Sequence, residues 1–335
     1  MNKVKNRIKG CLIGVAAGDS MGMPSSMMSP EEINTRFGKI KTFLPAPEDH
    51  LIHRGMVAGE ITDDTQQTLA IADSIIEKGE VDSMSIAEHL IKWAEDLGIF
   101  NNNVAGPSTL RALNMIRNGK SIEESGIVGD TNGACMRIGA VGIYGKGEFK
   151  RTLDAVEKSC KATHNTNIAI AGASAIAIVI GKAIRGESDV DTLIAYAKEA
   201  VNEGMIRGNI WYSASISKRI DWVLDLIETA ENKEQAMLDM YNYIGAGVQI
   251  SETVPTCLGI LKLSQGSPIE TVKIASNLGG DCDTIAAISG SMAGAIAGSD
   301  AFPAEWIKKL EKINNINFDY YSDKLYNLIY RELEK

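Results

Sequence analysis

Apolar residues recur every three or four positions along almost the whole chain. Leu69, Ala72 and Ile75 form one such series. This spacing is typical of a helix that buries one face, because an α-helix repeats every 3.6 residues. The sequence therefore predicts a helix that begins shortly after residue 65.

A second series shows how such helices begin and end. Leu110, Leu113 and Ile116 follow Gly106 and a proline, and Gly119 comes after the last of them. Proline is well placed in the first helical turn, and glycine commonly ends a helix. The same pattern predicts helices over residues 4–18, 85–97, 133–143, 151–160, 167–185, 190–203, 213–230, 234–243, 255–264, 268–276, 284–297, 303–313 and 319–334.

The alternating pattern of a half-buried strand is absent from the sequence, so we expect an all-α fold. No Pro/Ser-rich linker or repeat interrupts the helical pattern. With 44% apolar and 23% charged residues, the chain has the composition of a globular protein. We predict a single compact multi-helix domain over residues 1–335.

Two features of the predicted helices concern packing. The most apolar stretch, residues 168–180, is shorter than the ~20 residues that cross a bilayer, so we expect a buried core helix. Glycines at four-residue spacing allow helix backbones to approach closely, and a membrane dimer face of this kind would need a longer apolar segment. These glycines are Gly10, Gly14, Gly18 and Gly22, then Gly290, Gly294 and Gly298.

Charge and cysteine content exclude several classes of protein. The net charge is -9, with 43 acidic and 34 basic residues and no basic block, so we expect no nucleic-acid partner. The polar first residues do not resemble a secretory signal, and we expect a cytoplasmic protein without a membrane partner. Five widely separated cysteines give no disulfide framework or zinc ribbon and are expected to be buried.

The first candidate site is the run Thr-Asp-Asp-Thr at residues 62–65, directly before a predicted helix. Helix capping explains one Asp or Thr there, because a side-chain oxygen satisfies free N–H groups of the first turn. A second adjacent aspartate is explained less well by capping. Both interpretations stay open for this run.

The second candidate is the run Gly-Gly-Asp-Cys-Asp-Thr at residues 279–284, again before an apolar helix. Asp281 and Asp283 can converge on one cation, with Thr284 as a neutral oxygen ligand. Helix capping is the alternative here too. Cys282 is a poor nucleophile because flanking carboxylates disfavour its thiolate.

Carboxylate and hydroxyl oxygens favour Mg²⁺, Ca²⁺ or Mn²⁺ over zinc. An EF-hand is excluded, because the loop positions that need an oxygen ligand, a glycine and a glutamate hold Ile285, Ala286 and Met292. If the two acidic runs meet, four carboxylates repel one another unless they are protonated or neutralised. Two divalent ions would balance that charge.

Five motifs in order carry a resemblance that spans most of the chain. They are Gly-Val-Ala-Ala-Gly-Asp-Ser-Met-Gly-Met-Pro at residues 14–24, the run at 62–65, Asn-Gly-Ala-Cys-Met-Arg at 132–137, Thr-His-Asn at 163–165 and the run at 279–284. With these motifs the sequence resembles the ADP-ribosylglycohydrolase family, which includes dinitrogenase-reductase-activating glycohydrolase and some crystallin relatives.

The resemblance implies an all-helical fold, cleavage at the anomeric carbon of a ribose, and a site for two Mg²⁺ ions, with Mn²⁺ as a substitute. Asp63 and Asp64 are the candidate catalytic residues on the water-handling side. The expected substrate is a ribosyl or ADP-ribosyl small molecule or an ADP-ribosylated protein. The implied metal ligands are Thr62, Asp63, Asp64, Asp281, Asp283 and Thr284.

The resemblance also places substrate contacts at Asn132, Gly133, Met136, Arg137 and His164. From the residues alone, the first four form a polar turn before a helix, and the histidine has a loop or capping role. We expect a further motif residue, Asp19, to make a structural hydrogen bond, because an unpaired buried carboxylate is costly.

The chain departs from the family at Ser26, where many members carry a catalytic glutamate. Two alternatives to an ADP-ribosyl hydrolase therefore stay open. One is a hydrolase of a small ribonucleoside, and the other is a catalytically silent ADP-ribose-binding or crystallin-like protein.

Overall fold

The computed structural model describes residues 2–101 and 105–330. Those residues form helices and no strand, with three isolated bridges between distant segments, so the predicted all-α fold is confirmed. The helices are α1 (Lys3–Gly22), α2 (Pro30–Phe37), α3 (Asp63–Lys78), α4 (Ser83–Asp96), α5 (Pro107–Arg117), α6 (Ile122–Ser125), α7 (Gly133–Met136), α8 (Gly139–Gly145), α9 (Phe149–Cys160), α10 (Asn167–Ile184), α11 (Val190–Gly204), α12 (Ile216–Thr229), α13 (Lys233–Asp239), α14 (Ile250–Leu263), α15 (Pro268–Ser276), α16 (Cys282–Ala297), α17 (Ala304–Asn314) and α18 (Phe318–Ile329). Short turns are η1 (Met23–Ser25), η2 (Ile99–Asn101) and η4 (Ser299–Ala301), and η3 (Met240–Ile244) is a π-helical turn.

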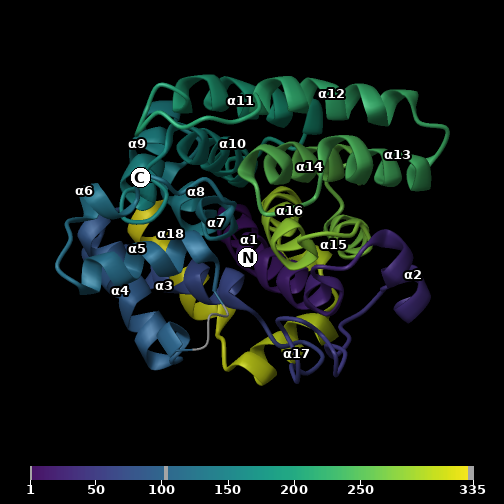
Figure 1. The fold of residues 1–335 in the computed structure, drawn as a ribbon, viewed down its shortest axis with the longest axis horizontal. Helices are drawn as coiled ribbons and strands as arrows, with labels where there is room; N and C mark the ends of the chain where they lie inside the picture. Colours follow the sequence, from purple (N-terminus) through teal and green to yellow (C-terminus); the bar gives the residue numbers. More distant parts are fainter. Residues whose placement is uncertain (1, 102–104, 331–335) are drawn as a thin grey trace.

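Helices α1 and α16 lie at the centre of the molecule (Figure 1). They run antiparallel with their backbones in contact, because the two glycine series face each other. A Cβ on Gly14 would lie 2.0 Å from the carbonyl oxygen of Gly290, and one on Gly22 would lie 2.3 Å from that of Cys282. The C-terminus of α1 is thereby held against the N-terminus of α16.

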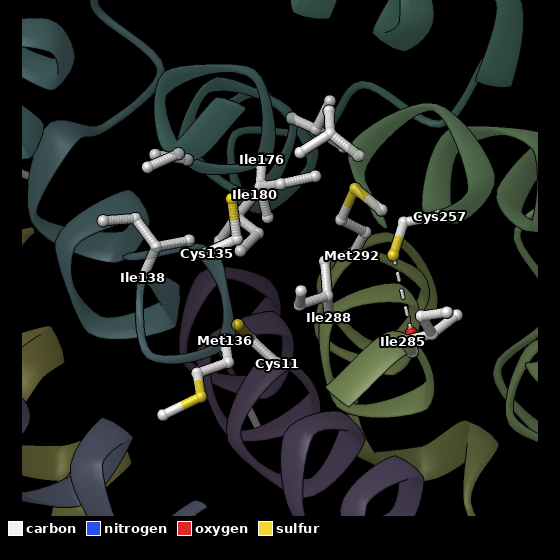
Figure 2. Packing of buried hydrophobic residues seen from close by; sticks show 14 of the residues in the cluster. Cys11, Cys135, Met136, Ile138, Ile176, Ile180, Cys257, Ile285, Ile288 and Met292 are labelled. Carbon is white, nitrogen blue, oxygen red and sulfur yellow. Dashed lines mark hydrogen bonds between the residues drawn. The ribbon is translucent and has the colours of Figure 1, made fainter. Parts of the chain in front are cut away.

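Helix α10 is the apolar core helix that the sequence predicted. All of its residues except Lys182 are buried. It is longer than the apolar stretch indicated: its 18 residues have a mean hydropathy of 1.8, enough to cross a membrane by length and composition, yet 94% of them are buried within the protein. Figure 2 shows side chains of α1, α7, α10, α14 and α16 meeting in the surrounding core, which also takes in the five unpaired cysteines.

The structure corrects two predicted helix boundaries. The helix expected over residues 133–143 is two helices, α7 and α8, because the chain turns at Arg137 and Ile138. The helix expected to start at Pro255 instead begins at Ile250. A proline inside a helix leaves the carbonyl four residues earlier without its donor. Here that carbonyl, of Ser251, accepts a 3.1 Å hydrogen bond from Arg219.

Helices α2 and α6 were not predicted, since both are short. The helix expected over residues 319–334 is described as far as residue 330, and its last residues lie outside the described part. The prediction of one domain over residues 1–335 stays a prediction, although one continuous core draws on helices from α1 to α18.

Candidate active site

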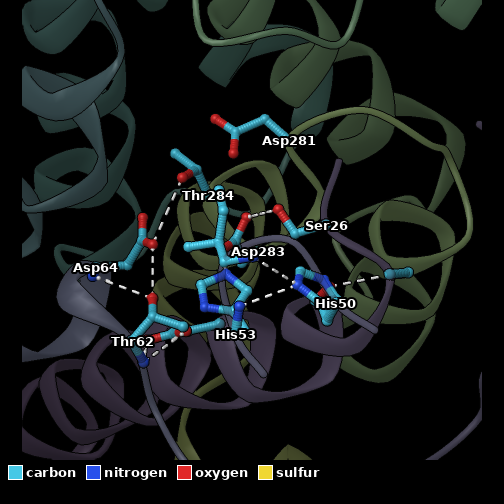
Figure 3. A network of polar contacts seen from close by, with 12 residues as sticks. Ser26, His50, His53, Thr62, Asp64, Asp281, Asp283 and Thr284 are labelled. Carbon is cyan, nitrogen blue, oxygen red and sulfur yellow. Dashed lines mark hydrogen bonds and ion pairs between the residues drawn. The ribbon is translucent and has the colours of Figure 1, made fainter. Parts of the chain in front are cut away.

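The two acidic runs meet where the N-terminus of α3 faces the N-terminus of α16. The Thr284 hydroxyl lies 3.5 Å from Oδ2 of Asp64 (Figure 3). A cavity of about 220 Å³ opens between them. Its lining, mixed polar and apolar, is Met27, Ile52, His53, Asp63, Asp64, Ala105, Gly106, Pro107, Thr109, Thr131, Asn132, Gly133, Met136, Val248, Asp281, Asp283 and Thr284.

Asp19, near the end of α1, ties α3 to the central helix pair. Its buried carboxylate accepts hydrogen bonds from the backbone N–H groups of Thr62, at 3.0 Å, and Thr65, at 3.1 Å, and from the Thr65 hydroxyl at 2.5 Å. Burial raises the pKa of Asp19 to about 6, against the lowering effect of these donors. The hydrogen bonds support the structural role expected for Asp19.

Helix capping explains only part of the acidic runs. Thr62 is the N-cap of α3 and accepts from the N–H of Asp64. Asp281 stands at the N-cap position of α16 but caps nothing; its carboxylate instead accepts a 2.6 Å hydrogen bond from the Asn132 amide. Since Asp63, Asp64 and Asp283 lie beyond the caps, none of the four aspartates has a capping function.

The aspartates repel one another in this arrangement. Burial, followed by the charges of Asp283 and Asp19, raises the pKa of Asp63 to about 7. Burial and neighbouring carboxylates also raise the pKa of Asp64 and of Asp281 well above its usual range. The cavity therefore favours either protons or cations.

The donor set fits a hard cation. Oδ1 of Asp64 is buried and has no hydrogen-bond partner, while Oδ2 accepts a 2.9 Å hydrogen bond from the Thr62 hydroxyl. A buried carboxylate oxygen without a donor is costly unless a cation or proton meets it. In the described ranges no three Asp, Glu, His or Cys side chains are already gathered as closely as metal ligands. A bound ion would therefore have to draw the aspartates together.

Two buried histidines, neither of them predicted from the sequence, extend the site. Nε2 of His53 lies 2.8 Å from Oδ2 of Asp283, and the Ser26 hydroxyl donates to the other oxygen at 2.6 Å. His50 Nδ1 accepts from the backbone N–H of His53 at 3.0 Å. The Ala46 N–H donates to the carbonyl of Met56 at 3.0 Å and joins the two ends of the loop that carries both histidines.

The His53–Asp283 contact shifts the pKa of both groups. Burial by itself would lower the pKa of His53, but the hydrogen bond and charge of Asp283 outweigh it and raise that pKa. Burial would raise the pKa of Asp283, but His53 and Ser26 outweigh it and hold that pKa well below its usual range. Among the aspartates that line the cavity, Asp283 thus has a lowered pKa, whereas those of Asp63, Asp64 and Asp281 are raised.

The predicted substrate-binding residues separate into two groups. Asn132, Gly133 and Met136 line the cavity, and their contact with substrate stays a prediction. Arg137 and His164 do not line the cavity: they are 1% and 0% exposed and lie behind the cavity wall. The prediction that these two contact substrate is not matched by this geometry, because the turn between α7 and α8 directs Arg137 into the interior.

Comparison with known proteins identifies the family. The family model for ADP-ribosylglycohydrolase matches residues 1–334. The chain belongs to the ADP-ribosylglycohydrolase family.

Individual relatives match over nearly their full length. The chain is 35% identical over 324 residues to the protein YegU of Escherichia coli, covering 95% of this chain and 96% of YegU. It is 25% identical over 317 residues to the ADP-ribosyl-[dinitrogen reductase] glycohydrolase of Rhodospirillum rubrum, covering 92% and 91%. A solved structure titled as an ADP-ribosylglycohydrolase-related protein complex has the same fold, with a TM-score of 0.70 at 20% identity and coverage of 98% and 99%.

As a member of the ADP-ribosylglycohydrolase family, the chain is an enzyme that hydrolyses a glycosidic bond. The resemblance drawn from five motifs is confirmed over the whole chain. Four of those motifs, which lie far apart in the sequence, contribute Asp19, Asp63, Asn132 and Asp283 to this region. Ser26, at the position where many members carry a glutamate, contacts Asp283.

Proposed function

We propose that the protein is a Mg²⁺-dependent hydrolase that cleaves the ribosyl bond of an ADP-ribosyl group, free or attached to a protein. The observation that carries the proposal is the convergence of four aspartates on one cavity, with a buried oxygen of Asp64 left without a donor. Two related enzymes carry ADP-ribosyl substrates in their names, the one from Rhodospirillum rubrum and the human ADP-ribosylhydrolase ARH3.

The cavity favours entry of one end of the substrate. Its volume of about 220 Å³ is below the roughly 300–1,000 Å³ typical of small-molecule sites. A ribose ring is the part of ADP-ribose whose hydroxyl groups suit the carboxylates of this cavity, while the rest of the molecule extends outward. Ile52 and Val248 add apolar side chains to the lining of the cavity.

The residues that would hold the metal ions are the oxygen donors at the two helix N-termini. When bound, Mg²⁺ supplies a Lewis acid and lowers the pKa of coordinated water. Those donors are Thr62, Asp63, Asp64, Asp281, Asp283 and Thr284.

The protein's own part in the reaction is mainly electrostatic. Cleavage at the anomeric carbon develops oxocarbenium-like positive charge, which the carboxylates around the cavity stabilise. In the proposed reaction, Asp63 and Asp64 orient a water and accept its proton. Asn132 holds Asp281 by a 2.6 Å hydrogen bond and so keeps that carboxylate directed at the cavity.

Product release from a defined panel tests the proposal. The purified full chain is incubated, with Mg²⁺ or with EDTA, with an ADP-ribosylated protein, ADP-ribosyl-arginine and adenosine. We expect Mg²⁺-dependent release of ADP-ribose from at least one of the first two, and loss of at least ~100-fold in rate for Asp283→Ala. Product release from adenosine alone would show that the substrate is a nucleoside rather than an ADP-ribosyl compound. Binding of all three compounds without release of any product would overturn the proposed reaction.

A further inference from the structure

The guanidinium of Arg137 is buried without a carboxylate partner among the described residues. Its side chain is 1% exposed, and its neighbours are neutral: Nη1 donates to Oε1 of Gln67 at 2.5 Å and to Thr109 at 3.3 Å, while Nη2 contacts Thr163 and, at 3.4 Å, Nδ1 of His164. Burial of an unpaired charge costs free energy, so we expect Arg137 to make an interaction that a neutral residue could not make.

Gln67 connects this charge to the cavity. It is fully buried on α3, and its Nε2 donates to Oδ2 of Asp63 at 2.9 Å, one helical turn away. A guanidinium can only donate, so it fixes which end of the Gln67 amide faces it. The oxygen must point to Arg137, and the NH₂ end must point to Asp63.

The result is a hydrogen-bonded series with one direction, from Arg137 through Gln67 to Asp63. A polarised amide donates more strongly, and its orientation cannot flip without losing the Arg137 contact. Asp63 is partly exposed to the cavity, and in the described part of the chain the Gln67 amide is the side chain that donates to its carboxylate.

We propose that Gln67 and Arg137 are positioning residues: Arg137 orients the Gln67 amide, and Gln67 holds the Asp63 carboxylate in the direction needed for catalysis. This inference rests on the proposed function, from which the role of Asp63 comes. It also explains why a motif arginine and its neighbour His164 lie behind the cavity rather than in it.

The test compares Gln67→Met with Gln66→Met. Both substitutions remove a glutamine hydrogen bond from adjacent positions of α3, but Gln66 accepts from Trp93 at 3.0 Å and does not touch Asp63. For each full-length variant we would determine a crystal structure, Mn²⁺ affinity by electron paramagnetic resonance, and kcat and KM. Arg137→Met and the Gln67→Met/Arg137→Met double variant complete a cycle, with Arg137→Lys replacing Arg137→Met if the latter does not fold.

We expect the Asp63 side chain to turn away or divide between rotamers in Gln67→Met and to stay in place in Gln66→Met. Mn²⁺ affinity and kcat should fall by about 10–100-fold in Gln67→Met, as for other residues that orient metal ligands, with a smaller change in KM. Because Arg137 acts through Gln67, its replacement in the Gln67→Met background should add no further loss.

Two results overturn the inference. One is an unchanged Asp63 in Gln67→Met, and the other is a double variant whose losses multiply those of the single variants. Failure of the proposed function looks different. In that case the wild-type protein binds no Mn²⁺ and releases no product, while the position of Asp63 in Gln67→Met still decides for or against the positioning role.

Discussion

The imidazole of His53 holds one carboxylate oxygen of Asp283 at 2.8 Å. We expect His53→Ala to free that carboxylate and to weaken Mn²⁺ affinity by about 10–100-fold, the usual effect of removing a group that orients a metal ligand. Titration of Mn²⁺ followed by electron paramagnetic resonance measures the change. His89→Ala, which alters a histidine outside the site, is the control. Equal affinity in His53→Ala and the wild type would show that Asp283 does not depend on this contact.

Asp64→Asn should stabilise the metal-free protein. Burial and four neighbouring aspartates raise the pKa of Asp64, so its charge opposes folding near neutral pH when no cation is present. In EDTA we expect the variant to have a higher melting temperature than the wild type. Mg²⁺ should raise the melting temperature of the wild type but not that of the variant. Asp96→Asn, at an exposed ion pair with Lys92, should change neither value. A Mg²⁺-dependent rise that survives in Asp64→Asn contradicts the metal site.

Gly14→Ala should destabilise the protein by about 1–3 kcal/mol, or prevent folding, because α1 and α16 have no room for a methyl group between them. The new Cβ would lie 2.0 Å from the Gly290 carbonyl oxygen. In Gly139→Ala the nearest atoms are 3.7 Å away, so that buried helical glycine is the matched control and should tolerate alanine. Urea unfolding gives both values. Similar stability for the two variants would mean that α1 and α16 can move apart to admit a methyl group at little cost in free energy.

His164 should make stability fall as the pH drops below about 6.5. Burial, followed by the charge of Arg137, lowers the pKa of His164 well below its ordinary value of 6.5. Below that pH the unfolded chain binds a proton that the folded protein does not, so acid favours unfolding by up to ~1.4 kcal/mol per pH unit.

Urea unfolding of the wild type and of His164→Gln at pH 7.5, 6.5 and 5.5 isolates this effect from that of the aspartates. The free-energy difference between the two proteins should shift in favour of the variant as the pH falls. A difference that stays constant over this range would mean that His164 takes up its proton equally well in the folded state.

The sequence predicted the fold well because the signals that define it are local. Helical periodicity located most of the helices, and glycines at four-residue spacing indicated backbone packing in both α1 and α16. That these two series pack against each other could not be predicted, since either could have met another small-residue surface. The partner became clear only from the distances between Gly14 and Gly290.

The site was predictable only where its chemistry lies in short motifs. His50 and His53 could not be predicted, because the loop that carries them has no periodic pattern and single histidines in loops are rarely functional. Arg137 was expected to contact substrate because it belongs to a family motif. Membership of a motif does not show where a side chain points. The direction is set by the turn that separates α7 from α8, which the helical pattern across residues 133–143 concealed.

The glycine contact between α1 and α16 leaves a choice of alignment. Because its small residues repeat every four positions, sliding one helix by about one turn, roughly 5–6 Å, would again set small residues opposite one another. The packing alone therefore permits several registers. Asp19 fixes a second alignment, that of α1 against α3, since its carboxylate accepts from the N–H groups of Thr62 and Thr65. The two halves of the site therefore meet only when both alignments are correct, that of α1 with α16 and that of α1 with α3.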